Sequence, residues 1–205
     1  MKQRLSCLFL WLSCLSLQGA ELEITILPNF SGTPLLADSL RYEISSKETL
    51  SFTRVSLLLS GFALEKETGG WVEIPGQNAW LDLEKQRWDV QLGGIPAGTY
   101  RAIRFFVGPD EKNNHADISK IPANDPLNPV LNNLHWNWQG GYIFMALEGY
   151  FRKGNDKPAG YSYHFARDPR RTCINLPVTL DLKQNGVLDL DRKSTRLNSS
   201  HEWIS

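Results

Sequence analysis

Three histidines, one methionine and two tryptophans gather in the middle of this 205-residue chain. They are His115, His135, Trp136, Trp138, Met145 and His164. Imidazole nitrogen and thioether sulphur suit copper better than magnesium or calcium, and the spacing fits no standard zinc pattern. Spacing alone favours a structural role, with satisfied histidines beside an aromatic core. Copper binding is the functional alternative.

Motifs of known catalytic families are missing from the sequence. It has no nucleophile elbow, phosphate-binding loop, GxGxxG or HExxH segment. Cys173 follows His164 by nine residues, which allows a thiol–imidazole pair, but a lone cysteine beside a strand is more often a small apolar residue. We therefore expect that the chain is not an enzyme. A copper-dependent redox enzyme stays an alternative.

Both ends of the chain are expected to lie outside the fold. Residues 1–20 combine a basic start, an uncharged run from Leu5 to Leu17 and small residues up to Ala20, which is typical of a secretory signal peptide. That run is shorter than the roughly 20 residues of a membrane-spanning helix. We therefore predict a periplasmic or secreted protein without a stable membrane span. Residues 191–205 resemble, from Asp191 to His201, a translated sequencing adapter and are predicted to be a non-native tail.

Excluding the ends changes the charge and the cysteine count. The ends hold five of the 22 basic and two of the 22 acidic residues, so residues 21–190 carry a net charge of −3. This charge argues against a nucleic-acid partner. Cys173 is the only cysteine between residues 21 and 190, and it cannot form an internal disulfide.

Short β-forming runs separated by glycine and proline predict an all-β fold, a single-domain antiparallel β-sandwich over residues 21–190. The runs are residues 21–27, 50–59, 71–74, 88–92, 101–107, 141–151, 161–165 and 172–182. Pro177 marks the last of them as an edge strand or a late strand start. Residues 109–133 contain four prolines and six asparagines, so we expect one long irregular segment there, the Pro/Asn-rich loop.

Several longer segments recur in the order known from one protein family. They are IPAGTYRAIRFFVGP at 95–109, NHAD at 114–117, DPLN at 125–128, HWNWQGGYIFMALEG at 135–149 and YHF at 163–165, followed by Cys173. Together they resemble the MbnP-like family of exported copper-binding proteins. The resemblance covers nearly the whole of residues 21–190 and implies a β-sandwich that binds copper. Its site chemistry is similar to that of MopE and CorA.

The resemblance also implies how such a site is made. In this family a dihaem protein of the MauG and cytochrome c peroxidase type, MbnH, oxidises one tryptophan to kynurenine, and histidines complete the copper site. His115 matches the histidine of the NHAD segment and His164 that of the later strand. Trp136 and Trp138 match the two tryptophans, and which of them is modified stays open.

Two further residues are candidate ligands on weaker grounds. His135 is not a fixed family feature, so it is an extra ligand or merely an exposed residue. Met145 lies on the opposite face from Trp136, Trp138 and Tyr142 if residues 135–145 form one unbroken strand. A bulge at Gly140 and Gly141 would reset that register.

Opening the indole ring changes what a tryptophan can bind. An intact indole offers an N–H donor and no useful lone pair, whereas kynurenine has an aniline nitrogen and a ketone oxygen that can bind a metal. The alternative function, from another class, is a β-sandwich interaction module without metal, in which the Trp/Tyr run is simply core.

Overall fold

The structure is a computed structural model that describes residues 19–138, 140–182 and 187–188. The predicted signal peptide, apart from Gly19 and Ala20, and the predicted tail lie outside these residues. The strands are β1 (Ala20–Thr25), β2 (Asn29–Phe30), β3 (Thr33–Pro34), β4 (Tyr42–Ser45), β5 (Glu48–Leu50), β6 (Arg54–Lys66), β7 (Trp71–Glu73), β8 (Ala79–Asp82), β9 (Asp89–Ile95), β10 (Gly98–Val107), β11 (His135–Trp136), β12 (Gly141–Lys153), β13 (Ala159–Ala166), β14 (Thr172–Leu182) and β15 (Val187–Leu188). The helices are α1 (Glu111–Asn114), α2 (Pro129–Asn132) and the 3₁₀ turns η1 (Ile118–Lys120) and η2 (Asp168–Arg170).

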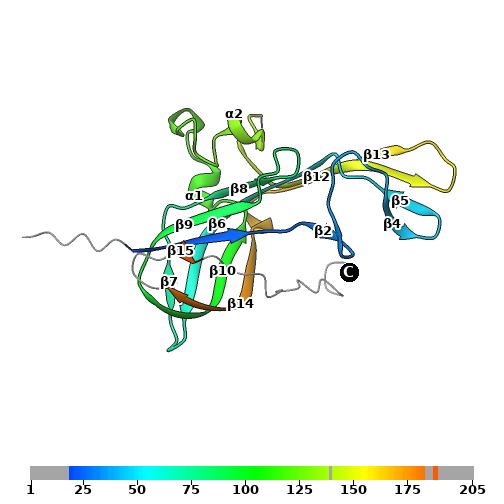
Figure 1. The fold of residues 1–205 in the computed structure, drawn as a ribbon. Helices are drawn as coiled ribbons and strands as arrows, with labels where there is room; N and C mark the ends of the chain where they lie inside the picture. The colour runs from blue at the N-terminus through cyan, green and yellow to red at the C-terminus, as the bar shows by residue number, and fades with distance from the viewer. Residues whose placement is uncertain (1–18, 139, 183–186, 189–205) are drawn as a thin grey trace, which may run out of the picture.

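Two sheets face each other, as the sequence predicts. The large sheet runs β14-β10-β6-β12-β5-β4, with β11 and β13 on β12 and with β7 and β8 on β6. The small sheet is β15-β1-β9, and β2 pairs with β3. All described pairings between strands are antiparallel except that of β1 with β15, which is parallel; the isolated bridge of Ala37 with Phe52 is also parallel. The all-β, sandwich-like prediction is confirmed (Figure 1).

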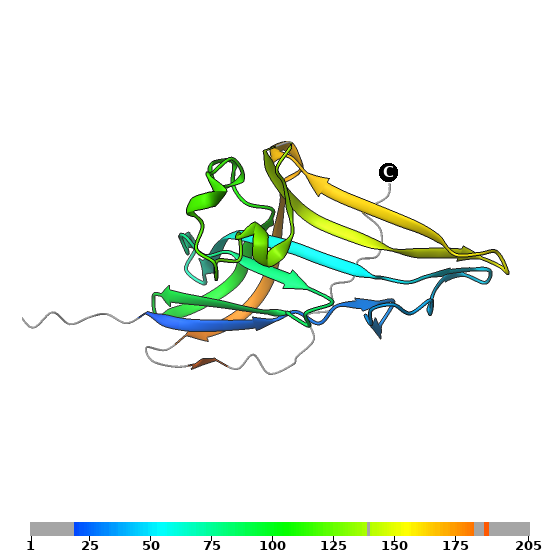
Figure 2. The ribbon, with the colours of Figure 1, turned by 90° about the horizontal axis from the view of Figure 1, so that it is seen from above.

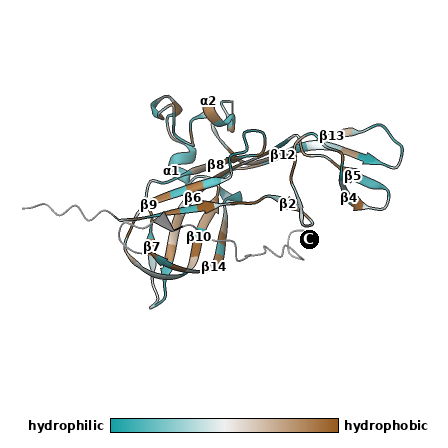
Figure 3. Ribbon diagram, viewed as in Figure 1, coloured by the Kyte–Doolittle hydropathy of each residue, from teal (hydrophilic) through white to brown (hydrophobic). Residues whose placement is uncertain are grey.

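The main core lies between the two sheets. Alternate residues of β1 and β9, such as Leu22 and Leu92, meet Phe62 of β6, Ile103 of β10 and Leu180 of β14. Hydrophobic residues therefore concentrate on the strands of the two facing sheets, whereas α1 is hydrophilic (Figure 3). The alternation predicted for residues 172–182 is present. β14 has β10 as its one neighbour in the described order of the sheet, which agrees with the edge position inferred from Pro177.

One predicted boundary is wrong. The run from residue 50 was expected to end at Gly61, but β6 continues through this glycine to Lys66. Gly61 has a φ of 60°, and the pairing of β6 with β10 shifts register beside it. A glycine in the left-handed region accommodates such an irregularity without ending the strand.

Buried asparagines organise the Pro/Asn-rich loop. The side chain of Asn128 accepts a hydrogen bond from the backbone of Val130 at 2.9 Å and donates one to the carbonyl of Ile121 at 3.0 Å. Asn132 accepts one from the backbone of Leu134 at 2.7 Å. These amides replace the backbone ladders that the loop lacks. The irregular segment is therefore held in place by its asparagines, with α1, η1 and α2 as its regular parts.

The long hairpin of β12 and β13, with β4 and β5 beside it, extends beyond the small sheet as an arm (Figures 1 and 2). β12 pairs with β13 from Ile143 to Phe151 on one side, and with β6 and then β5 on the other. In the part of the chain that the structure describes, no helix is long and apolar enough to cross a membrane.

Gly149 permits the close approach of β12 to Ser51. A Cβ atom at this position would lie 1.9 Å from the Ser51 carbonyl oxygen. We expect Gly149→Ala to lower the free energy of unfolding by about 2–4 kcal/mol, because the backbones must separate. Urea denaturation measures this. Gly160→Ala on the neighbouring β13 is the control, since its added Cβ would meet nothing closer than 3.9 Å. Equal losses in the two variants would contradict the prediction.

Candidate functional site

His115 lies at the end of α1 with both ring nitrogens held by oxygen atoms. Nε2 is 2.8 Å from Oδ2 of Asp168, and Nδ1 is 3.1 Å from the carbonyl oxygen of Gly140. Both partners are acceptors, so this geometry suits an imidazole that carries a proton on each nitrogen. A metal ion at His115 would therefore have to replace one of these two oxygens.

Asn114 fixes the carboxylate that holds His115. Its buried side chain donates to Oδ1 of Asp168 at 2.8 Å and accepts from the backbone N–H of Tyr142 at 2.8 Å. Asp168, the first residue of η2, thereby connects η2 to the Pro/Asn-rich loop. Asp168 was not predicted from the sequence, because 53 residues separate it from His115 and no motif contains it.

The contacts of His115 shift its acid–base equilibrium. The hydrogen bond to Asp168, and after it the one to Gly140, raises the pKa of His115, while the hydrogen bond from His115 lowers the pKa of Asp168. Because the folded pKa of His115 is raised, the ion pair stabilises the fold at pH values below the ordinary histidine pKa. This contribution is lost as the pH rises through the folded pKa.

We expect Asp168→Asn to lower the pKa of His115 toward its ordinary value of about 6.5, since the largest cause of its elevation is removed. An NMR titration of the His115 ring protons measures the change. Asp117→Asn is the matched control, because Asp117 bonds to Ser119 and Lys120. A pKa of His115 that stays raised in Asp168→Asn would show that the carboxylate does not cause the shift.

The two tryptophans lie on a tight turn and not on one long strand. β11 ends at Trp136, the backbone N–H of Gly140 donates to the carbonyl of Trp136 at 2.8 Å, and β12 begins at Gly141. The condition of one unbroken strand over residues 135–145 is therefore not met, because Gly140, with a φ of 66°, reverses the chain. The rings of Trp136 and Trp138 nevertheless lie together, with centroids 5.8 Å apart.

The tryptophans differ in their surroundings. Trp136 is half-buried, packs against the core cluster around Tyr142, and lies 5.9 Å from the ring of His164. Trp138 is 76% exposed. The interpretation of the whole aromatic run as core therefore holds for Tyr142 and Phe144, which are fully buried, but not for Trp138.

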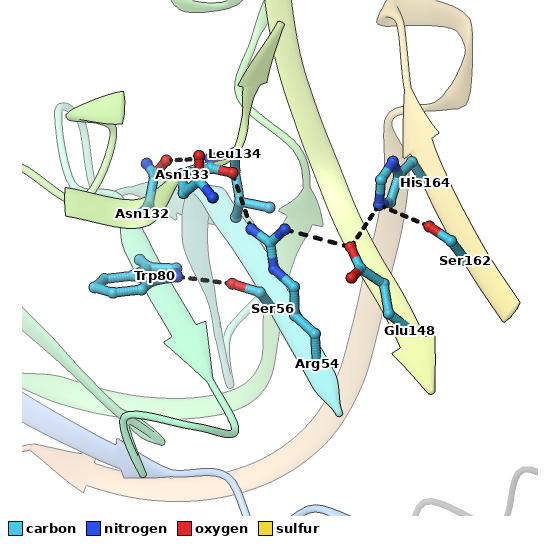
Figure 4. A network of polar contacts seen from close by, with 9 residues as sticks. All are labelled: Arg54, Ser56, Trp80, Asn132, Asn133, Leu134, Glu148, Ser162 and His164. Carbon is cyan, nitrogen blue, oxygen red and sulfur yellow. Dashed lines mark hydrogen bonds and ion pairs between the residues drawn. The ribbon is translucent and has the colours of Figure 1, made fainter. Parts of the chain in front are cut away.

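His164 belongs to a polar network across three strands (Figure 4). Its Nε2 is 2.8 Å from Oε1 of Glu148 on β12 and 3.2 Å from Oγ of Ser162. Arg54 on β6 contacts the same Oε1 at 3.3 Å and donates to the carbonyl of Asn133 at 2.9 Å. The roles of Glu148 and Arg54 were not predicted from the sequence, although Glu148 lies in the segment that carries the family resemblance.

His135 and Met145 are not brought together with the other two histidines. His135 hydrogen-bonds to Asn137 at 3.0 Å and packs edge-on against Tyr142. Met145 directly precedes Ala146, which lies opposite His164 in the sheet, so its side chain points to the other face. His115 thus lines the same cavity as Trp136, and His164 packs against the ring of Trp136, whereas Met145 points to the other face of the sheet from His164.

A cavity of about 380 Å³ lies beside His115 and Trp136. It is lined by Asn114, His115, Trp136, Gly140, Gly141, Tyr142, Ala166, Arg167, Asp168 and Pro169. Trp136 thus lines the cavity of His115 and also contacts His164. Among the described residues no three His, Cys, Asp or Glu side chains form a metal-binding group. The unmodified side chains therefore fit copper only in part, with two imidazoles around an intact indole.

Comparisons with known proteins agree with this architecture. The chain is similar to the solved structure of MbnP from Methylosinus trichosporium, with a TM-score of 0.50 and 16% sequence identity over 80% of this chain and 72% of that one. At this identity the likeness supports the fold. A search of curated proteins found no match. The family model MbnP matches residues 19–199. The chain therefore belongs to the MbnP family, whose members are non-enzymatic, copper-related accessory proteins of methanobactin systems.

Proposed function

We propose that this chain is an exported, periplasmic or secreted, copper-binding protein whose site forms around Trp136 after that residue has been oxidised to kynurenine. The position of Trp136 carries the proposal. Its indole lines the cavity of His115 and lies 5.9 Å from the ring of His164. A metal-binding group made from this ring would lie at the cavity of His115 and beside the ring of His164.

Trp136 and Trp138 take different roles in this proposal. Trp138 is 76% exposed and its ring lies 5.8 Å from that of Trp136. An exposed indole in ring contact with a half-buried one suits electron transfer to a haem outside the protein. We therefore assign Trp138 as the surface relay and Trp136 as the residue that is converted, with a dihaem partner of the MbnH type as the oxidant.

The conversion balances with hydrogen peroxide as the terminal oxidant. Two equivalents, reduced to four water molecules through the haem partner, accept four electrons and four protons. The indole releases these as two water molecules supply one oxygen atom each to C2 and C3, and the C2–C3 bond breaks. Hydrolysis of the resulting N-formyl group releases formate and leaves the aniline nitrogen. The net mass gain is about 4 Da. The new aniline nitrogen and ketone oxygen supply the donor that the indole lacks.

His115 must also change partners for copper to bind. One of its nitrogens donates to the carbonyl of Gly140, in the turn that begins at Trp136. Oxidation of Trp136 alters the first residue of this turn. Loss of the Gly140 contact would leave Nδ1 of His115 for the metal, while Asp168 still holds Nε2.

Intact-mass analysis tests the proposal. The purified protein is treated with an MbnH-type partner and hydrogen peroxide. One portion is then digested for peptide mapping, and a second portion is left intact and offered copper. We expect a gain of about 4 Da on the peptide that spans Trp136 and Trp138, and retention of copper after desalting only in the converted protein. An unchanged mass in the presence of an active partner, with no copper retained, would favour the metal-free interaction module instead.

A further inference from the structure

Glu148 connects His164 to the rest of the protein. Its Oε1 atom lies 2.8 Å from Nε2 of His164 and 3.3 Å from the guanidinium of Arg54. The three side chains are 23–29% exposed, so they are largely shielded from water. In Figure 4 the carboxylate of Glu148 lies between the imidazole and the guanidinium.

The register of the sheet sets this arrangement. Glu148 of β12 lies directly opposite Arg54 of β6, and His164 of β13 lies opposite Ala146. Residues two apart on a strand share a face, so Ala146 and Glu148 point to the same side as His164. Glu148 therefore reaches His164 diagonally and Arg54 directly, as side chains on one face of a sheet do.

We propose that Glu148 is the positioning residue of His164: it fixes the ring proton of His164 on Nε2 and leaves Nδ1 as the metal-binding atom. The metal-binding role of Nδ1 rests on the proposed function. A neutral imidazole has one donor and one acceptor nitrogen. An ionised carboxylate only accepts, so it selects the N–H form at the nitrogen that it contacts. No hydrogen bond within the described part of the chain uses Nδ1 of His164.

Ser162 makes the selection necessary. Its hydroxyl lies 3.2 Å from the same Nε2 atom, and a hydroxyl can donate as well as accept. Without Glu148, Ser162 could donate to Nε2 and move the proton of the ring to Nδ1. That form would present no lone pair at the proposed metal-binding atom.

Arg54 holds the carboxylate of Glu148 in place and connects it to the Pro/Asn-rich loop. One nitrogen contacts Glu148, and another donates at 2.9 Å to the carbonyl of Asn133, directly after α2. Asn133 has a φ of 52°, the left-handed conformation that ends this helix. The Pro/Asn-rich loop is therefore linked to the imidazole of His164 through the contacts of Arg54 and Glu148.

The tautomer of His164 tests the proposal in the full, unmodified and metal-free chain. Long-range ¹H–¹⁵N correlation spectra at a pH of about 8.5, where an ordinary imidazole is neutral, assign the proton to one ring nitrogen. We expect the wild type to show the Nε2–H form, and Glu148→Leu to shift the ring toward Nδ1–H. Glu148→Gln should restore the wild-type pattern largely, because its amide oxygen can still accept from His164.

Glu65→Leu is the matched control. It removes a Glu–Arg pair of the same sheet, with Arg101 at 2.6 Å, that does not touch a histidine. We expect it to leave the His164 signals unchanged. Wild-type ring signals in Glu148→Leu, or an equal change in Glu65→Leu, would overturn the assignment of Glu148. Thermal melting identifies any variant that has lost the fold. If Glu148→Leu is unfolded, the His164 ring signals of Glu148→Gln and of Glu148→Asp, whose carboxylate is on a shorter side chain, are compared with those of the wild type.

Copper affinity of the converted protein gives the second measurement. Loss of an outer partner of a ligand typically lowers metal affinity about 10- to 100-fold, and we expect this range for Glu148→Leu and less for Glu148→Gln. If converted wild type bound no copper, the proposed function would fail, while the tautomer result would still decide the role of Glu148. If copper bound equally well to all variants, the link between Glu148 and the metal would be refuted.

Discussion

Replacing Trp136 with phenylalanine is expected to abolish the gain of about 4 Da that the wild type shows after treatment with an MbnH-type partner and hydrogen peroxide. A phenyl ring still packs against the core cluster around Tyr142 but has no pyrrole ring to open. The variant should therefore stay folded, keep its mass and retain no copper. Peptide mapping after digestion and metal analysis after desalting measure both effects.

Trp138→Phe separates the relay from the converted residue. We expect this variant to gain the same mass as the wild type but more slowly, on the order of tenfold or more, because the exposed ring in contact with Trp136 is lost as an electron relay. Trp71→Phe on β7 makes the same chemical change at a ring that stacks on Arg104 and should have no effect. Conversion that persists in Trp136→Phe and disappears in Trp138→Phe would reverse the two assignments.

The fold was predictable where a strand alternates. β1 and β14 each bury one face, and the polar and apolar residues of these strands appear in turn, as a period of two requires. β8, all of whose residues are buried, was not predicted, because a short run without alternation gives no such signal. The end predicted for the β6 run at Gly61 was wrong, because the sequence does not distinguish a glycine that allows an irregularity within a strand from one that ends the strand.

The candidate site was predictable only as a set of residue types. His115, His164 and the two tryptophans come from the sequence, but the partners that orient the histidines do not. Asp168 reaches His115 across 53 residues, and Glu148 reaches His164 diagonally across two strands. The contact of Asp168 with His115 joins η2 to the end of α1, and no local pattern in the sequence predicts how two such segments meet. The contact of Glu148 with His164 depends on the register of paired strands, which one residue of slippage would reverse. The same dependence explains why Met145, close to Trp136 in sequence, lies on the other face.

His115→Ala and His164→Ala are each expected to lower the copper affinity of the converted protein by about 100-fold or more. Loss of an outer partner alone typically costs about 10- to 100-fold, so loss of the ligand itself should cost at least as much. Their side chains are 53% and 26% exposed, and neither belongs to a hydrophobic core, so their replacement leaves the cores intact and the melting temperature should change little. Competition against a chelator of known affinity measures the copper affinity, and the double variant should retain no copper.

His135→Ala is the matched control for these two variants, because it removes an imidazole from the same segment. Its ring is held against Tyr142 and by Asn137, and His135 does not line the cavity that contains His115 and Trp136. We therefore expect a copper affinity within a few-fold of the wild type. A loss in His135→Ala as large as in His164→Ala would show that His135 is itself a copper ligand. Undiminished binding in the His115 and His164 double variant would refute both assigned ligands.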